Sequence, residues 1–187
     1  MGSESFRLSF DLDAKDIAYF RARFRRARQA ARDSELEEVL AAARSLVEEI
    51  RGAPRVPAFV IQAVGSLEDL LEIVEDADYR APRAVVNRAL AALAYFVDPH
   101  DLIPDEIPVL GFLDDAIMIK FVEREFRHEL SAYRKFRRFR EGAEQRPWTD
   151  VARSRLPGRL AAKRQKLREE VVRREKADEA KGLPRFA

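Results

Sequence analysis

The segment YFVDPHDLIPDEIPVLGFLDD, residues 95–115, most strongly limits the folds open to this chain. Pro99, Pro104 and Pro108 lock φ and remove backbone donors, so no α-helix continues through the segment. Each proline also pushes the residue before it toward extended geometry. The leucines, isoleucines and valine between and directly after the prolines are too apolar for a solvated loop. We therefore predict a stiff corner between two helices, with its aliphatic side chains turned inward.

Helical spacing of apolar residues occurs on both sides of this corner, and no strand-like alternation of any length is present. Ser34 and Glu37 have the spacing of a capping box, and Pro82 suits the first turn of a helix. The expected helices span residues 13–32, 34–52, 58–77, 82–97, 112–140 and 159–180, with a short piece before the last one that breaks at Pro157–Gly158. The patterns predict an all-α fold, an irregular bundle of five to six helices with the proline-rich corner buried between the fourth and the fifth.

Charge is distributed unevenly along the chain. Residues 1–119 hold 14 Lys/Arg and 22 Asp/Glu, a net charge of −8, whereas residues 120–187 hold 21 and 11, a net charge of +10. We predict a helical domain over residues 1–145 and a basic C-terminal helical extension over residues 146–187. Such a positive region either attracts nucleic acid, acidic lipid or an acidic protein, or complements the acidic part of the same chain.

Three features bear on the compartment. The chain has no cysteine, which excludes disulfides and thiolate metal sites and fits a reducing environment. Its longest apolar run, ALAALAYFV at residues 89–97, is far shorter than the roughly 20 residues that a transmembrane helix needs. The N-terminal stretch MGSESFRLSFDLD has no apolar core of the signal-peptide kind. These observations predict a soluble, cytoplasmic protein without a transmembrane segment.

Carboxylates gather in and just after the corner. The candidate metal ligands are Asp98, His100, Asp101, Asp105, Asp114 and Asp115. They are the oxygen-rich kind of set that Mg²⁺ or Ca²⁺ takes, but their spacing matches no familiar ligand loop. The favoured interpretation is structural: the acids inside the corner accept backbone hydrogen bonds, and the last two benefit from a helix dipole. We therefore expect no cofactor and no catalytic residue, with a divalent-metal protein or hydrolase as the alternative.

A second candidate surface is YRKFRRFR, residues 133–140, in which aromatic and basic residues alternate. The basic candidates are Arg134, Lys135, Arg137, Arg138 and Arg140, and seven further cations between Arg153 and Arg168 extend the positive field. Alternation of this kind suits base stacking and phosphate contacts. We favour a solvated helix with its aromatic side chains in the core, because no nucleic-acid-binding motif accompanies the charge. Nucleic-acid binding and peripheral contact with an acidic membrane are the alternatives.

The stretch ALAYFVDPHDLIPDEIPVLGFLDDAIMI resembles the signature of the YkvA-like family, a bacterial domain of unknown function. The matching residues, within residues 84–122, are Pro99, Asp101, Leu102, Ile103, Pro104, Asp105, Pro108, Gly111, Asp114 and Asp115. The chain departs from the family pattern at His100 and Glu106, where an apolar or aromatic residue is usual. The resemblance implies a helical fold and no established activity. We therefore predict a non-enzymatic interaction or assembly module, whose partner is an unidentified protein or a second copy of the chain.

Overall fold

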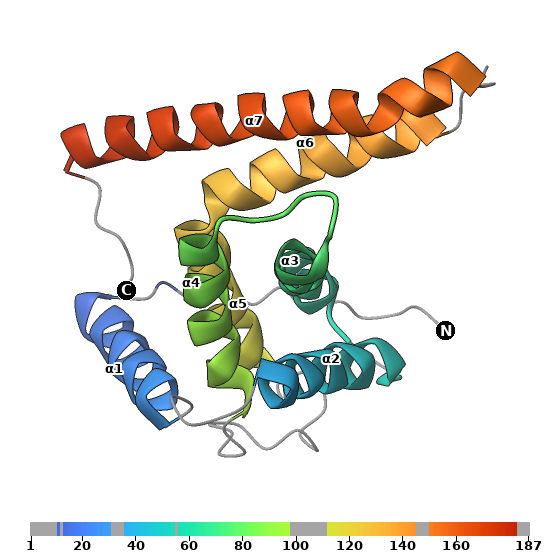
Figure 1. The fold of residues 1–187 in the computed structure, drawn as a ribbon. Coiled ribbons are helices and arrows are strands. Elements are labelled where there is room, and N and C mark those ends of the chain that lie inside the picture. The colour runs from blue at the N-terminus through green and yellow to red at the C-terminus, as the bar shows by residue number, and fades with distance from the viewer. Residues whose placement is uncertain are drawn as a thin grey trace, which may run out of the picture.

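The computed structural model describes residues 11, 13–30, 36–54, 56–97, 112–144 and 150–182. These residues form seven α-helices and one 3₁₀ turn and no strand (Figure 1). The elements are α1 (Ala14–Ala30), α2 (Leu36–Gly52), α3 (Ala58–Glu75), α4 (Arg83–Leu93), η2 (Ala94–Val97), α5 (Leu113–Glu125), α6 (Arg127–Glu144) and α7 (Asp150–Ala180). The predicted all-α bundle is confirmed, with more helices than the five to six expected.

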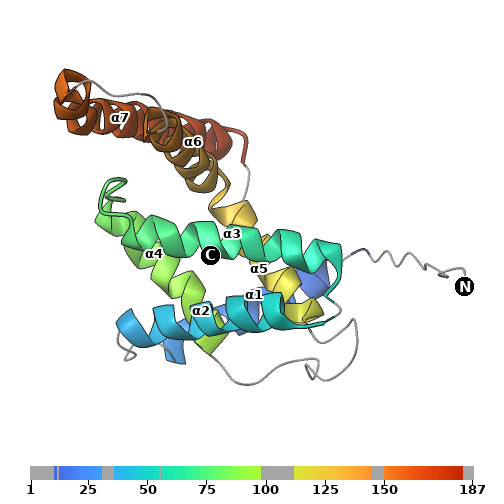
Figure 2. The same cartoon turned by 90° about the vertical axis from the view of Figure 1, so that its right-hand side faces the viewer.

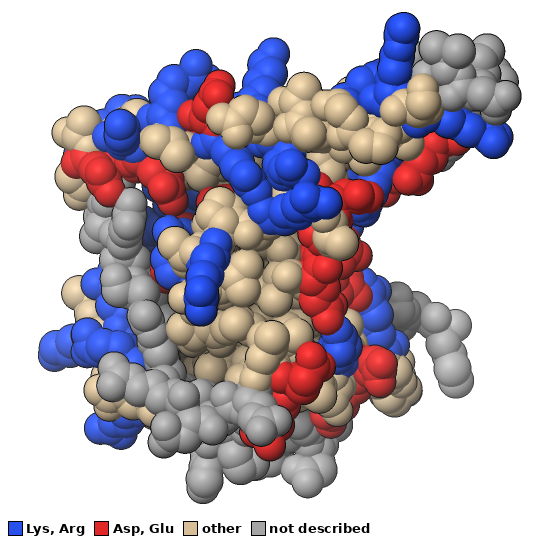
Figure 3. Space-filling model, in the orientation of Figure 1, with Lys and Arg blue, Asp and Glu red and all other residues tan. Residues whose placement is uncertain are grey.

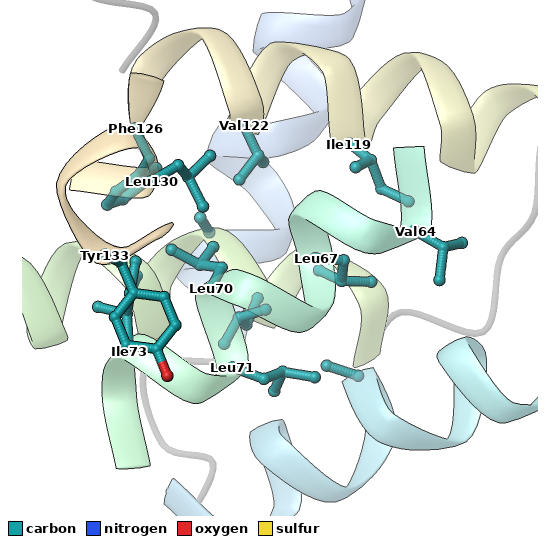
Figure 4. Close-up of a cluster of buried hydrophobic side chains, with 14 of the residues drawn as sticks. Val64, Leu67, Leu70, Leu71, Ile73, Ile119, Val122, Phe126, Leu130 and Tyr133 are labelled. Atoms are coloured by element: carbon teal, nitrogen blue, oxygen red, sulfur yellow. The ribbon is translucent and has the colours of Figure 1, made fainter. Parts of the chain in front are cut away.

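Helix α3 lies at the centre of the bundle, packed against α2, α4, α5 and α6 (Figures 1 and 2). Most of its apolar residues are buried, and Val64, Leu67 and Leu70 are completely buried, whereas Phe59 near its start is exposed. Figure 4 shows Leu67 and Leu70 among side chains of α5 and α6, including Val122 and Leu130. The core therefore forms around α3, and the helices on either side of it hold its charged face in one orientation.

The helix expected over residues 112–140 is two helices, which is a correction to the sequence-based prediction. α5 ends and α6 begins around Phe126, whose φ of −93° and ψ of 14° depart from helical geometry. The Phe126 ring is buried, with the Arg88 guanidinium of α4 5.2 Å from its centroid. A single straight helix would carry its apolar stripe away from the compact core, and the bend at Phe126 brings α6 back over α3.

Helix α7 is continuous through Pro157 and Gly158, where a break was expected. Pro157 removes the helical hydrogen bond to the carbonyl group of Arg153, but Arg153 and Pro157 are exposed, so this carbonyl group is open to solvent. On its other side α7 packs along α6 and buries Leu160, Leu167 and Val171. This packing holds the helix together across the proline. The division into two parts at residue 145 stays a prediction.

Candidate functional site

The proline-rich corner lies outside the described residues, because the structure describes nothing between residues 98 and 111. Asp98, His100, Asp101 and Asp105 are therefore not placed. Asp114 and Asp115 lie in the first turn of α5, as expected, and are 4% and 8% exposed. In the part of the chain that is described, no three His, Asp or Glu side chains gather as metal ligands would. The Mg²⁺ or Ca²⁺ site stays a prediction.

Three of the basic candidates on α6 pair with acids on and directly after α3, and we name this set the α3–α6 charge ladder. It consists of Asp69 and Glu72 on α3, Asp76 directly after the end of α3, and Arg134, Arg137 and Arg140 on α6. Asp69 occupies one end: its Oδ2 accepts from Arg134 Nε at 2.5 Å and its Oδ1 from Arg137 Nη1 at 2.9 Å. The charges on each helix repeat every three or four residues and so lie along one face of that helix. The ion pairs therefore follow one another in the same direction along both helices.

The Asp76 carboxylate joins the ladder to the turn between α3 and α4. Its Oδ1 accepts the backbone N–H groups of Asp78 and Tyr79 at 2.8 and 2.9 Å. Its Oδ2 accepts Arg140 Nη1 at 2.8 Å and the Tyr133 hydroxyl at 3.0 Å. Burial by itself raises the pKa of Asp76, but these four donors outweigh burial and lower the pKa below its ordinary value. One ionised side chain therefore positions both α6 and the chain entering α4.

The remaining basic candidates and the aromatic residues between them differ in their surroundings. Lys135 donates to Glu170 of α7 at 2.7 Å, whereas Arg138 is exposed. Tyr133 and Phe136 are buried, and Phe139 is half-buried under two cations of α7. These rings offer no open face on which a base would stack. Nucleic-acid binding at this segment stays a prediction, and the geometry does not favour it.

Two shallow grooves border the ladder. The first groove, of about 400 Å³, lies at the Asp69 end of the ladder, and its lining includes Glu68 and Glu123. The second groove, of about 560 Å³, lies at the Asp76 end, and its lining includes Glu75, Glu141 and Glu144. Figure 3 shows the acidic side chains of this face as a red band below α7. In both grooves the ladder acids already accept hydrogen bonds from arginines. The arrangement therefore holds α6 on α3.

A second polar cluster is buried beneath α7, where Glu129 of α6 is only 6% exposed and hydrogen-bonds Tyr79. Burial raises the pKa of Glu129, and repulsion from Glu175 adds to the shift, against the opposing influence of Arg88, Tyr79 and Arg168. Arg88 lies 3.6 Å from Glu175 on α7. The ionised form of Glu129 is thus disfavoured where α4, α6 and α7 meet.

We expect the substitution Glu129→Gln to raise the melting temperature at pH 7 by about 2–4 °C, the shift that about 1 kcal/mol produces in a chain of this size. The pKa of Glu129 is raised in the folded state. The stability that this shift contributes is therefore fully present below the ordinary pKa of 4.5, where Glu129 is protonated, and is lost as the pH rises through the folded-state pKa. The gain should therefore shrink in thermal melts at pH 4. Glu144→Gln, an exposed change on the same helix, should leave the melting temperature unchanged at both pH values.

The acids of the ladder and Glu129 are absent from the predicted site residues. A signal for the ladder was present, since residues 69, 72 and 76 and residues 134, 137 and 140 carry opposite charges at helical spacing. That spacing does not reveal which helices are neighbours. Glu129 has no such signal, because its burial follows from the bend at Phe126.

These features describe an all-helical protein with a hydrophobic core around α3 and with ion pairs that join α6 to α3. The chain belongs to the YkvA-like family: 80 of its residues are 39% identical to the uncharacterized membrane protein YkvA of Bacillus subtilis strain 168, an alignment that covers 41% of this chain and 74% of that protein. A family model described as a protein of unknown function (DUF1232) matches residues 88–121. No solved structure matches the chain. The predicted family is confirmed, and the family carries no assigned activity.

The expected cytoplasmic localisation is wrong, because the Bacillus relative is named a membrane protein. Within the residues described, no helix combines the length and the apolar character that crossing a bilayer requires. The error has a physical cause. A missing apolar run of about 20 residues argues against a spanning helix but has no bearing on contact with a membrane surface.

Proposed function

We propose that the chain is a non-enzymatic interaction module that attaches to the surface of an anionic membrane. The observation that carries the proposal is the basic half of α7, Arg153–Arg168, which contains seven Lys or Arg and no Asp or Glu. The α3–α6 charge ladder neutralises cations of α6, but Arg155 and Lys166 of α7 are exposed and form no ion pair with any residue that the structure places. The name of the Bacillus relative supports the same direction.

The physics of this surface favours a reversible attachment. A Lys or Arg near an anionic leaflet contributes about 1 kcal/mol, and the contribution fades within a Debye length. The apolar side chains of α7 (Leu160, Leu167 and Val171) are buried against α6, so they are not available for insertion into lipid. Attachment would therefore depend on charge and would weaken as salt is added.

Flotation of the full chain with lipid vesicles tests the proposal. We expect binding to vesicles that contain phosphatidylglycerol, little binding to pure phosphatidylcholine, and release between about 0.1 M and about 1 M salt, where the Debye length falls from ~10 Å to ~3 Å. Serum albumin added to the same vesicles controls for trapping of unbound protein. Equal binding to both lipids, or no binding to either, would contradict the proposal.

The other predicted functions have less support from the described residues. A metal-dependent or hydrolytic role depends on corner residues that lie outside the described part of the chain. Self-association through the acidic face of α3 and the basic helix of a second copy stays a prediction, although the ladder shows that part of this acidic face is already paired within one chain.

A further inference from the structure

Four of the exposed cations of α7 are arranged in a straight line. Arg155, Arg159, Lys166 and Arg173 are all exposed, and their spacings of four, seven and seven residues place them within about 40° of one another around a helix. We name these four residues the α7 stripe. At 1.5 Å per residue the stripe is about 27 Å long. Figure 3 shows Lys and Arg side chains projecting from α7 on the side turned away from the rest of the molecule.

The packing of α7 fixes the direction in which the stripe points. Leu160, Leu167 and Val171 lie roughly 120° around the helix axis from the stripe and are buried. Polar contacts hold both ends of the packed region: Arg164 Nη1 donates to the Asp78 carbonyl at 2.7 Å, and Arg127 and His128 of α6 pair with Asp178. The stripe is therefore a preformed surface, and binding through it needs no rearrangement of the helix.

We propose that the α7 stripe is the face that docks on the membrane, with anionic phospholipid headgroups as its partner; this inference rests on the proposed function. A straight row of cations on a rigid helix lies flat on a planar array of phosphates, so all four contact it together. Arg159 also lies 5.6 Å from the Phe139 ring, which limits the conformations of its side chain. Two acids, Glu169 and Glu170, lie beside the stripe on the described surface of α7, and Glu170 pairs with Lys135 and Arg174.

The test compares two triple variants with the same change in net charge. The stripe variant is Arg155→Gln, Lys166→Gln and Arg173→Gln, which leaves Arg159 on its aromatic ring. The control is Lys15→Gln, Arg25→Gln and Arg26→Gln, exposed cations on α1. Helix α1 lies away from α7 (Figure 1), so the control changes the total charge but not the stripe.

Partitioning onto phosphatidylglycerol vesicles is measured for the full chain and both variants. Each cation accounts for about a five-fold change, so the stripe variant should bind roughly 100-fold more weakly, while the control stays within about two-fold of the unmodified chain. Replacing Arg155 and Arg173 with Lys should preserve binding, because the charge is kept. Circular dichroism and thermal melting confirm that both variants fold.

Each other outcome has a distinct meaning. If both triple variants lose binding equally, overall charge is responsible and the stripe inference is wrong. If neither variant loses binding, the stripe inference is wrong but the proposed membrane attachment stands. If the unmodified chain does not bind vesicles, both the proposed function and the stripe inference are wrong. Loss of RNA binding or of a salt-sensitive dimer in the stripe variant, without loss of vesicle binding, would assign the stripe to one of those partners.

Discussion

Replacing Asp76 with alanine should lower the free energy of unfolding by about 3 kcal/mol, because loss of this carboxylate leaves four hydrogen-bond donors without their acceptor. Loss of a capping side chain costs about 1 kcal/mol, and hydrogen bonds to charged groups contribute about 1.5–3 kcal/mol. The Asp76 side chain is 7% exposed, so water does not replace the lost acceptor easily. The melting temperature should fall by about 6–12 °C in calorimetry.

The pH dependence of this substitution separates it from a general packing defect. The pKa of Asp76 is lowered in the folded state, so its contribution is present above the ordinary value of 3.8 and is lost as the pH falls through the folded value. The difference between the unmodified chain and Asp76→Ala should therefore be constant near neutral pH and shrink below about pH 4. Asp76→Asn keeps an oxygen for the two backbone N–H groups and should lose about half as much stability. Equal losses at every pH would contradict the assigned role.

Replacing Asp69 with alanine should cost about 2 kcal/mol of unfolding free energy, measured by urea denaturation. Its side chain is 6% exposed and accepts from two arginines, whose own side chains are more than one third exposed. A fully buried pair broken on one side costs about 3–5 kcal/mol, and the exposure of Arg134 and Arg137 reduces that penalty. A cycle of Asp69→Asn with Arg134→Met should give a coupling energy of about 1–2 kcal/mol.

A surface pair on the same helix provides the control for that cycle. Glu68 of α3 pairs with Arg51 of α2, and the side chains are 32% and 48% exposed. Exposed pairs contribute about 0–1 kcal/mol, and added salt weakens them. The Glu68 and Arg51 cycle should therefore give less coupling than the ladder cycle. Comparable values for both pairs would mean that the ladder is a surface feature and does not hold α6 on α3.

The membrane experiments and the stability experiments address different parts of the molecule. The ladder and Asp76 hold α6 against α3, whereas the stripe lies on the outer side of α7. Substitutions in the ladder should therefore lower the melting temperature and leave vesicle binding unchanged at temperatures where the variant is still folded. This independence allows a loss of lipid binding in the stripe variant to be interpreted without a folding defect.

Helix positions followed closely from the sequence, because the spacing of apolar residues and the prolines act locally. α2, for example, ends at Gly52 as expected, and α3 begins at Ala58 directly after Pro57. Local rules failed at two places. They joined α5 to α6 across Phe126, and they divided α7 at Pro157, where exposure and packing along α6 made the proline tolerable.

The candidate site was harder to predict for the same reason. The basic segment at residues 133–140 was recognised as a charged surface, but the sequence did not reveal that Arg134, Arg137 and Arg140 face the acids of α3. Residues 69 and 134 are far apart in the chain, and their meeting depends on the bend at Phe126. The straight α7 stripe likewise depends on a helix that continues through Pro157.

The amino-acid sequence by itself determined the helical class, the family and the separation of acidic from basic regions, because composition and short-range spacing are sufficient for these properties. Only the tertiary structure decided which charges neutralise one another and which remain exposed. The physical reason is that an ion pair requires two groups within a few ångströms, and the packing of the core around α3 sets those distances.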